Sequence, residues 1–149
     1  MKTLIIGGTG LIGAETARLM NSHGHEVTLM SRNSTTNPAL SQYKHIAHDY
    51  IHDDISTDVL DKFDWLVFSA AADIRMLPEG HDEETFFMHA NTDRVPYFFE
   101  KAAQSKIKKA VYIGTWYPVV VPDKIQTSSY VRSRFEADKL LRQYSNPEF

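Results

Sequence analysis

The sequence predicts an α/β fold built on a doubly wound parallel sheet with the strand order 3-2-1-4-5, and three observations predict it. Residues 3–6 are an uncharged run of β-branched residues and Leu, typical of a strand buried on both faces. Three glycines spaced three apart follow this run and precede a helix-forming segment, residues 14–20. Beyond them, strand-like and helix-like segments alternate, which is typical of a parallel sheet with right-handed crossovers.

The same patterns predict each element in order. We expect the first helix at about residues 11–22, ending near Gly24 as a left-handed cap. Four further strands are expected at residues 26–30, 45–49, 64–70 and 109–114. Further helices are expected at 56–62 (short), at 82–104 with an interruption near Thr92 caused by Pro96, and at 129–143 with Ser128 or Ser129 as N-cap. Loops are expected at residues 34–42, 71–80 and 116–127.

The composition restricts the class of protein. With 149 residues, 42% of them hydrophobic, the chain suits one globular domain with a sizeable core. The net charge of -3 does not favour nucleic acid, and no apolar run is long enough to span a membrane. A strand directly after Met1 and Lys2 leaves no signal peptide, so we expect a cytoplasmic protein. Without cysteine there is no disulfide, thiolate metal ligand or Cys nucleophile.

The order strand, glycine turn, helix is typical of the start of a dinucleotide-binding βαβ unit. In this interpretation Gly7 allows a tight turn, Gly10 leaves room for a pyrophosphate, and Gly13 lets helix and strand pack closely. Free N–H groups and the helix dipole favour an anion at the start of the helix. The alternative is a tight turn that binds no ligand.

A family resemblance rests on four landmarks in order: Gly7-Gly8-Thr9-Gly10-Leu11-Ile12-Gly13, the small-residue segment Phe68-Ser69-Ala70-Ala71-Ala72, Asn91, and Val111-Tyr112-Ile113-Gly114-Thr115. Together they resemble the extended and atypical short-chain dehydrogenase/reductases, the NAD(P)-dependent epimerase/dehydratase family. The resemblance covers the whole chain and implies a Rossmann-like domain with NADP or NAD as cofactor. It also implies hydride transfer on a hydroxyl or carbonyl substrate, for which a nucleotide sugar is one candidate.

The end of the second strand bears on the choice of dinucleotide. An acidic residue there would bond the ribose 2′-hydroxyl, whereas this chain has Ser31 and Arg32, which suit a 2′-phosphate and so favour NADP. The alternative for Arg32 is a solvated charge. Asp49 and Tyr50 resemble the family's adenine-contacting position. The expected cofactor-binding residues are Gly7, Thr9, Gly10, Leu11, Ile12, Gly13, Ser31, Arg32, Asp49, Tyr50, Ala70 and Ala71.

The family's catalytic pair is a Tyr followed four residues later by a Lys. Tyr97 and Lys101 match these letters but precede the last strand, so we interpret them as an accidental match. Tyr130 and Arg134 have the same spacing on the later helix, which puts both on one helix face. The resemblance then implies Tyr130 as general acid or base, Thr115 as its hydrogen-bonding partner on the substrate oxygen, and Arg134 as the cation beside the nicotinamide ribose.

Arg134 leaves alternatives open. An Arg does not deprotonate, so it cannot relay a proton as a Lys does. A catalytically impaired dinucleotide-binding sensor or regulator is therefore the second candidate function. The alternative without a catalytic role is that Tyr130 and Arg134 form a surface pair on an ordinary helix.

Other features carry weaker expectations. His45, His48 and His52 lack tetrahedral ligand spacing, so no metal site is expected. Trp116 and Tyr117 either line a substrate pocket or pack over the edge of the sheet. The resemblance implies a small-molecule substrate and a homodimer as one possible assembly. Because the family's substrate is set by a C-terminal segment, we expect residues 1–149 to be a fragment with little turnover by itself.

Overall fold

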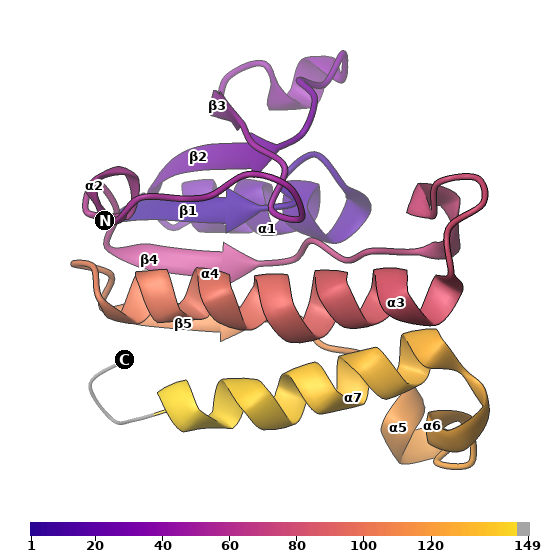
Figure 1. Ribbon diagram of the computed structural model, residues 1–149. Coiled ribbons are helices and arrows are strands. Elements are labelled where there is room, and N and C mark those ends of the chain that lie inside the picture. The colour runs from indigo at the N-terminus through magenta and orange to yellow at the C-terminus, as the bar shows by residue number, and fades with distance from the viewer. Residues whose placement is uncertain (146–149) are drawn as a thin grey trace. The chain divides into compact units, whose positions relative to one another are not determined.

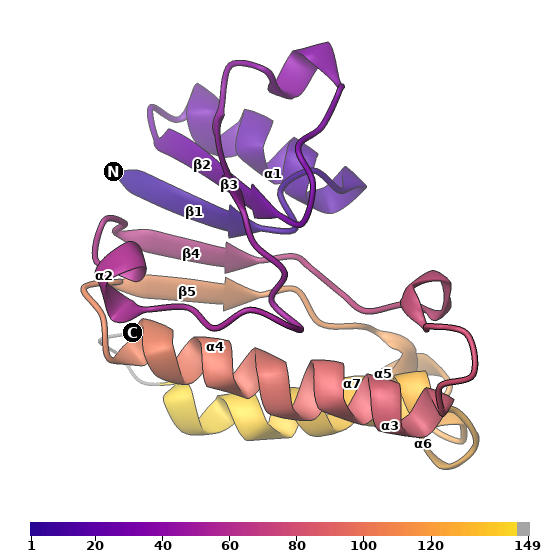
Figure 2. The same cartoon turned by 45° about the horizontal axis from the view of Figure 1, so that its top comes forward.

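The computed structural model describes residues 1–145, which form two compact units. We call the first, Met1–Ala70 with Lys101–Ile113, the sheet unit. The second, Ala71–Glu100 with Gly114–Ser145, is the helical unit. Figures 1 and 2 show the helices and strands of both.

The sheet unit contains a Rossmann-like parallel sheet of five strands in the order β3-β2-β1-β4-β5, which confirms the predicted order. Its strands are β1 (Lys2–Ile6), β2 (Glu26–Ser31), β3 (Lys44–Ala47), β4 (Trp65–Phe68) and β5 (Lys109–Tyr112). In the register of the sheet, Ile6 lies opposite both Met30 and Phe68. The carboxyl ends of the strands therefore share one edge, as Figure 2 shows.

The last three strands end two residues earlier than the sequence predicts. After β4, both the amide and the hydroxyl of Ser69 bond the carbonyl of Ile6, at 2.9 and 2.8 Å. After β5, the Ile113 amide bonds the Phe68 carbonyl at 2.9 Å. One main-chain hydrogen bond thus follows the last paired residue of β4 and of β5, but the paired register itself ends at Phe68 and Tyr112.

Helix α1 (Leu11–Ser22) packs on one face of the sheet, over a core of aliphatic residues: Ile5, Ala17, Val27, Leu29, Leu40 and Val67. It has the predicted bounds, and Gly24 follows it with a φ of 80°, the left-handed geometry expected of the cap. Two smaller elements complete this unit. They are the 3-10 turn η1 (Pro38–Leu40), inside the expected loop 34–42, and α2 (Thr57–Leu60), inside the expected short helix 56–62.

Aromatic rings pack beside β4 and β5. The ring of Phe68 is fully buried. The ring of Tyr50 meets it edge-on at 5.2 Å, and the Tyr112 ring lies 6.1 Å from it. Among the strands within residues 1–145, β5 pairs with β4 alone, and its Val111 is 51% exposed.

In the helical unit, the predicted long helix is interrupted where the sequence expects it. It consists of α3 (Glu83–Met88), a π-helical turn labelled η3 (His89–Asp93) and α4 (Arg94–Ala103), of which the last three residues are assigned to the sheet unit. Pro96 has no amide to bond the carbonyl of Thr92, four residues earlier, so the regular hydrogen-bond pattern fails there. The wider π-turn directly precedes this point, as such turns do at irregular positions of helices.

The C-terminal part of the helical unit corrects one expectation. Residues 116–127 are not a loop throughout, because they contain α5 (Tyr117–Val120) and α6 (Lys124–Thr127). Pro118 lies in the first turn of α5, where a helix needs no amide, so proline does not prevent it. The 3-10 turn η2 (Ile74–Met76) similarly occupies part of the expected loop 71–80.

Helix α7 (Ser129–Leu141) follows, and its last turn continues as the 3-10 turn η4 (Arg142–Tyr144). Its N-cap is Ser128, whose hydroxyl accepts a hydrogen bond from the Val131 amide at 3.4 Å. None of the helices within residues 1–145 is long and apolar enough to cross a bilayer.

Candidate functional site

The glycine turn between β1 and α1 is shaped by close contacts of the main chain. Gly7 has a φ of 76°, and its amide donates to the Met30 carbonyl at 2.8 Å, which ties the turn to β2. A Cβ atom on Gly13 would lie 2.3 Å from the Gly7 carbonyl oxygen, and one on Gly7 would lie 2.6 Å from the Ala70 nitrogen. No side chain fits at either position, because main-chain atoms would have to move.

Gly10 has a different environment. A Cβ atom on Gly10 would make one tight contact, with the Gly7 carbonyl oxygen at 3.3 Å, and would have no other non-adjacent neighbour among residues 1–145 within 4 Å, so the space beside it is open apart from this contact. Thr9, partly exposed, precedes it in the turn. Helix α1 begins immediately afterwards, with Gly10 as its N-cap and no acidic residue in its first turn.

The first amides of α1 follow Gly10 directly in the chain. The first helical amide that bonds the turn is that of Ala14, to the Gly10 carbonyl at 2.8 Å. The amides of Leu11, Ile12 and Gly13 make no hydrogen bond to any residue within 1–145. The start of α1 therefore offers unused donors and the positive end of a helix dipole, the arrangement that favours an anion.

Ser31 and Arg32 lie at the carboxyl end of β2, the strand bonded to this turn. The Ser31 hydroxyl lies 2.9 Å from the carbonyl oxygen of Asn33 and 2.8 Å from Nε2 of His45. The exposed Arg32 side chain makes no hydrogen bond or ion pair with another residue in the described part of the chain. Sequence reasoning considered His45 only as a metal ligand. It missed this contact because the register of β2 and β3 cannot be read from one sequence.

The remaining cofactor candidates differ in accessibility. Asp49 forms a local turn, its Oδ1 accepting from the Ile51 amide at 3.0 Å and its own amide donating to Asp53 at 2.8 Å. Tyr50 is only 6% exposed, so its ring belongs to the core. Ala70 lies against Gly7 at the edge of the sheet, whereas Ala71 is the first residue of the helical unit and is exposed.

The three candidate catalytic residues, Thr115, Tyr130 and Arg134, belong to the helical unit. Tyr130 and Arg134 both lie on α7, as predicted. The Tyr130 ring packs edge-on against Phe87 at 5.5 Å, and its hydroxyl bonds no other residue within 1–145. Arg134 is 3% exposed, so its guanidinium group is not a solvated surface charge. The Thr115 hydroxyl accepts from the Tyr117 amide at 3.5 Å.

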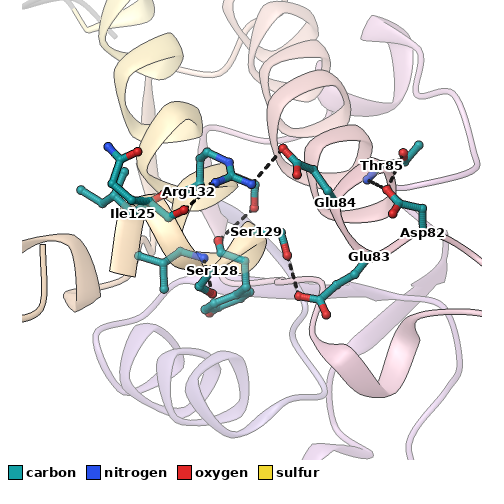
Figure 3. A network of polar contacts seen from close by, with 12 residues as sticks. Asp82, Glu83, Glu84, Thr85, Ile125, Ser128, Ser129 and Arg132 are labelled. Carbon is teal, nitrogen blue, oxygen red and sulfur yellow. Dashed lines mark hydrogen bonds and ion pairs between the residues drawn. The ribbon is translucent and has the colours of Figure 1, made fainter. Parts of the chain in front are cut away.

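Polar contacts hold the start of α7 (Figure 3). The Ser129 hydroxyl donates to Glu83 at 2.5 Å, and Arg132 pairs with Glu84 at 2.9 Å. Arg132 also reaches the carbonyl oxygens of Ile125 and Gln126, at 3.5 and 3.4 Å. The first turn of α7, which contains Tyr130, is thus tied to both α3 and α6 by side chains.

The N-cap of α3 belongs to the same region. Asp82 accepts from both the amide and the hydroxyl of Thr85, each at 2.8 Å. The Thr85 amide and then its hydroxyl hold the pKa of the Asp82 carboxyl below its usual value, since both bonds favour the charged form. Asp82 thereby fixes the end of α3 that carries Glu83 and Glu84.

A buried polar contact holds the middle of α7. Asn91, in the π-turn, is fully buried and donates from Nδ2 to the Ser133 hydroxyl at 3.0 Å. The Ser133 hydroxyl donates in turn to the Tyr130 carbonyl at 2.9 Å. Sequence reasoning named Asn91 only as a landmark and did not single out Ser133. The sequence pattern that indicates Ser133 is a small polar residue on the inner side of an amphipathic helix.

Two further groups of side chains were singled out by the sequence. Trp116 and Tyr117 stack on each other, with ring centroids 5.3 Å apart, and Trp116 is 66% exposed. Tyr97, of the sequence match before the last strand, lies on α4 with the Arg94 guanidinium 4.6 Å from its ring centre. Residues 1–145 contain no group of three or more His, Asp or Glu side chains suited to hold a metal ion.

Known proteins are similar to this chain in sequence. A sequence model of the NAD dependent epimerase/dehydratase family matches residues 3–147. The Homo sapiens protein "Epimerase family protein SDR39U1" is 56% identical over 32 residues, which are 22% of this chain and 11% of that protein.

Solved structures resemble the fold. The UDP-Glc/GlcNAc 4-epimerase of Campylobacter jejuni has a TM-score of 0.75 at 24% identity, over 99% of this chain and 50% of that one. The NAD dependent NDP-hexosamine 5,6-dehydratase TunA has a TM-score of 0.75 at 19% identity, over 96% of this chain and 49% of that one. The UDP-glucuronic acid 4-epimerase of Bacillus cereus has a TM-score of 0.73 at 18% identity, over 99% of this chain and 53% of that one. The chain spans about half the length of these structures, and such low identities show the fold alone.

Proposed function

The chain belongs to the NAD dependent epimerase/dehydratase family, and we propose that its sheet unit binds NAD or NADP at the glycine turn. The observation that carries the proposal is the open space at Gly10 beside the unused amides of Leu11, Ile12 and Gly13. These donors suit the pyrophosphate of a dinucleotide, whose oxygens only accept hydrogen bonds. No acidic side chain in the first turn of α1 opposes such a ligand.

We further propose that NADP is the preferred dinucleotide. β2 ends at Ser31 and Arg32 follows it, so no carboxylate is present there to bond a ribose 2′-hydroxyl. The exposed Arg32 guanidinium has no partner within residues 1–145, so a 2′-phosphate would not have to displace an ion pair to reach it.

For the complete protein we propose an epimerase, dehydratase or reductase that acts on a hydroxyl or carbonyl group. A bound nicotinamide supplies the acceptor or donor of a hydride. Tyr130 would take or give the proton at the substrate oxygen through its phenol group, which bonds no other residue in the described chain. Thr115 would hydrogen-bond the same oxygen. A nucleotide sugar is the substrate class we favour, since the similar structures include nucleotide-sugar epimerases.

A second function, a dinucleotide-binding sensor or regulator without turnover, is favoured by Arg134. It stands where the family's pattern has Lys, it is buried, and an Arg does not give up its proton. Arg134 would still supply a fixed positive charge to orient a ligand, which serves binding as well as catalysis.

Calorimetric titration of NADP and NAD into the 149-residue chain tests the binding site. Gly10→Val should abolish binding of both while leaving the circular dichroism spectrum unchanged, because the new side chain would fill the open space beside the amides. Ser22→Val, at the other end of α1, is the matched control and should bind normally. Equal affinity of wild type and Gly10→Val would overturn the proposal.

Turnover separates the enzyme from the sensor. The natural full-length protein, once it binds NADP or NAD, would be assayed with nucleotide sugars and simple alcohols by nicotinamide absorbance and by product chromatography. Turnover lost in Tyr130→Phe supports the enzyme. The sensor is supported if the protein binds the cofactor tightly but turns over no substrate of the panel, and if Arg134→Lys does not produce turnover either.

A further inference from the structure

The hydroxyl of Ser31 has two partners and a single hydrogen. The carbonyl oxygen of Asn33, at 2.9 Å, can only accept, so the hydroxyl hydrogen is directed to it. Nε2 of His45, at 2.8 Å, must then be the donor, which assigns the imidazole hydrogen to Nε2. The three groups form one directed chain, from the His45 ring through the Ser31 hydroxyl to the Asn33 carbonyl.

These two hydrogen bonds stabilise the turn that contains Arg32. Ser31 and Asn33 flank Arg32 in sequence, and their bond closes the turn around it. The Ser31 carbonyl is held as well, by the His48 amide at 3.0 Å. The Arg32 side chain itself contacts nothing by hydrogen bond or ion pair within residues 1–145. The direction in which its guanidinium group leaves the sheet therefore depends on a backbone that His45 and Ser31 hold.

We propose that His45 is a positioning residue for the choice between NADP and NAD. It acts through Ser31 to fix the backbone of Arg32 so that the guanidinium group meets the ribose 2′-phosphate. This rests on the proposed function, and it changes the expected part of Ser31. With its hydrogen given to Asn33, the Ser31 hydroxyl braces the turn and does not donate to the phosphate.

The test measures the dissociation constants of NADP and NAD at one pH and one salt concentration. His45→Leu removes the donor and should weaken NADP by roughly three- to tenfold, the worth of one ordinary hydrogen bond, while changing NAD less than about twofold. His45→Gln should restore the wild-type ratio, because its side-chain amide can donate from a similar position. Ser31→Ala should resemble His45→Leu, and the double variant should lose no more than either single one, as expected of residues acting in one chain.

A second histidine in the protein, His25, provides a matched control. His25 bonds the hydroxyl of Thr3 at 2.8 Å, at the amino end of the strands. His25→Leu therefore removes the same kind of His–hydroxyl contact, but just before the first residue of β2, whereas Ser31 is its last residue. It should lower the melting temperature but leave the NADP-to-NAD ratio unchanged. This separates a loss of general stability from a loss of positioning.

Three results would overturn the inference while leaving the proposed function in place. They are an unchanged ratio in His45→Leu, an equal loss for both dinucleotides, or a changed ratio in Ser31→Ala alone, which would mean that Ser31 touches the phosphate directly. Failure of the wild-type chain to bind either dinucleotide would instead overturn the proposed function, and this inference with it.

Discussion

The sheet unit and the helical unit differ in the polar residues that they bury. In the sheet unit, fully buried aliphatic and aromatic residues such as Leu4, Ile5 and Phe68 pack on a continuous parallel ladder. The helical unit also buries apolar residues such as Phe87 and Val95. Its interior, however, contains Asn91, Ser133 and Arg134 as well, and ion pairs and hydroxyl contacts hold the start of α7.

This difference matters for the two halves of the proposed function. The binding turn is shaped by main-chain atoms, so its geometry depends on three glycines rather than on side-chain charges. The position of Tyr130 on α7 depends on side chains whose contacts respond to salt and pH. The comparison predicts that substitutions in the turn act through packing, and substitutions around α7 through polar contacts.

The largest effect is expected within the glycine turn. Gly13→Ala should destabilise the chain by about 3 kcal/mol, because the added methyl group would overlap the Gly7 carbonyl and force the main chain apart. Gly10→Ala should cost about 1 kcal/mol, since its methyl group would lie 3.3 Å from that oxygen, a tight contact but a full ångström longer than the one at Gly13. Urea unfolding of both variants measures the contrast, and equal losses would contradict it.

A smaller effect is expected at the buried polar contact of the helical unit. Asn91→Ala should cost about 1–3 kcal/mol, because the variant loses a buried hydrogen bond and leaves the Ser133 hydroxyl without its donor. Thr92→Ala is the control in the same π-turn, where the hydroxyl bonds the Met88 carbonyl within its own helix. Thermal unfolding should show a clearly larger loss for Asn91→Ala. A larger loss for Thr92→Ala would show that the Asn91 contact is not the one that matters.

The ion pair at the start of α7 should contribute less. Arg132→Gln removes the pairing with Glu84, whose side chain is 58% exposed, so a loss of about 0.2–1 kcal/mol is expected at low salt. At 1 M salt the difference from wild type should shrink. Lys139→Gln, which removes a pair formed within α7, provides the comparison. A salt-independent loss would show that Arg132 acts through its carbonyl contacts instead.

The smallest effect concerns pH. Because the pKa of Asp82 is lowered by the Thr85 amide, its cap stabilises the fold above the usual carboxyl pKa, and this stabilisation is lost as pH falls through the folded-state value. Asp82→Asn keeps a capping oxygen but cannot titrate. The melting temperature of wild type should therefore fall more steeply than that of Asp82→Asn below about pH 4. Parallel curves would contradict this.

The sequence predicted the features that depend on local pattern. The strand order, the bounds of α1 and the cap at Gly24 follow from the apolar run at 3–6, the glycines and the alternation of elements. The interruption near Thr92 follows from Pro96, although one sequence does not specify a π-turn.

Features that depend on packing between distant segments could not be predicted. The helices α5 and α6 are four-residue single turns, too short to produce a periodic pattern. The bond between Ser31 and His45 depends on the register of β2 and β3. The burial of Tyr50 against Phe68 depends on how a loop returns to the sheet, and it leaves Asp49 as the more accessible of the two adenine-contact candidates.

Amide chemical shifts in ¹⁵N-labelled protein report directly whether a dinucleotide binds at the start of α1. As NADP is added to the 149-residue chain, we expect the largest shifts at the amides of Leu11, Ile12 and Gly13, with further shifts at Ser31 and Arg32. Lys2, Glu26 and Asp64, at the opposite edge of the sheet, should not shift. Shifts that are largest at that opposite edge, or no saturable shift at residues 11–13, would contradict the account.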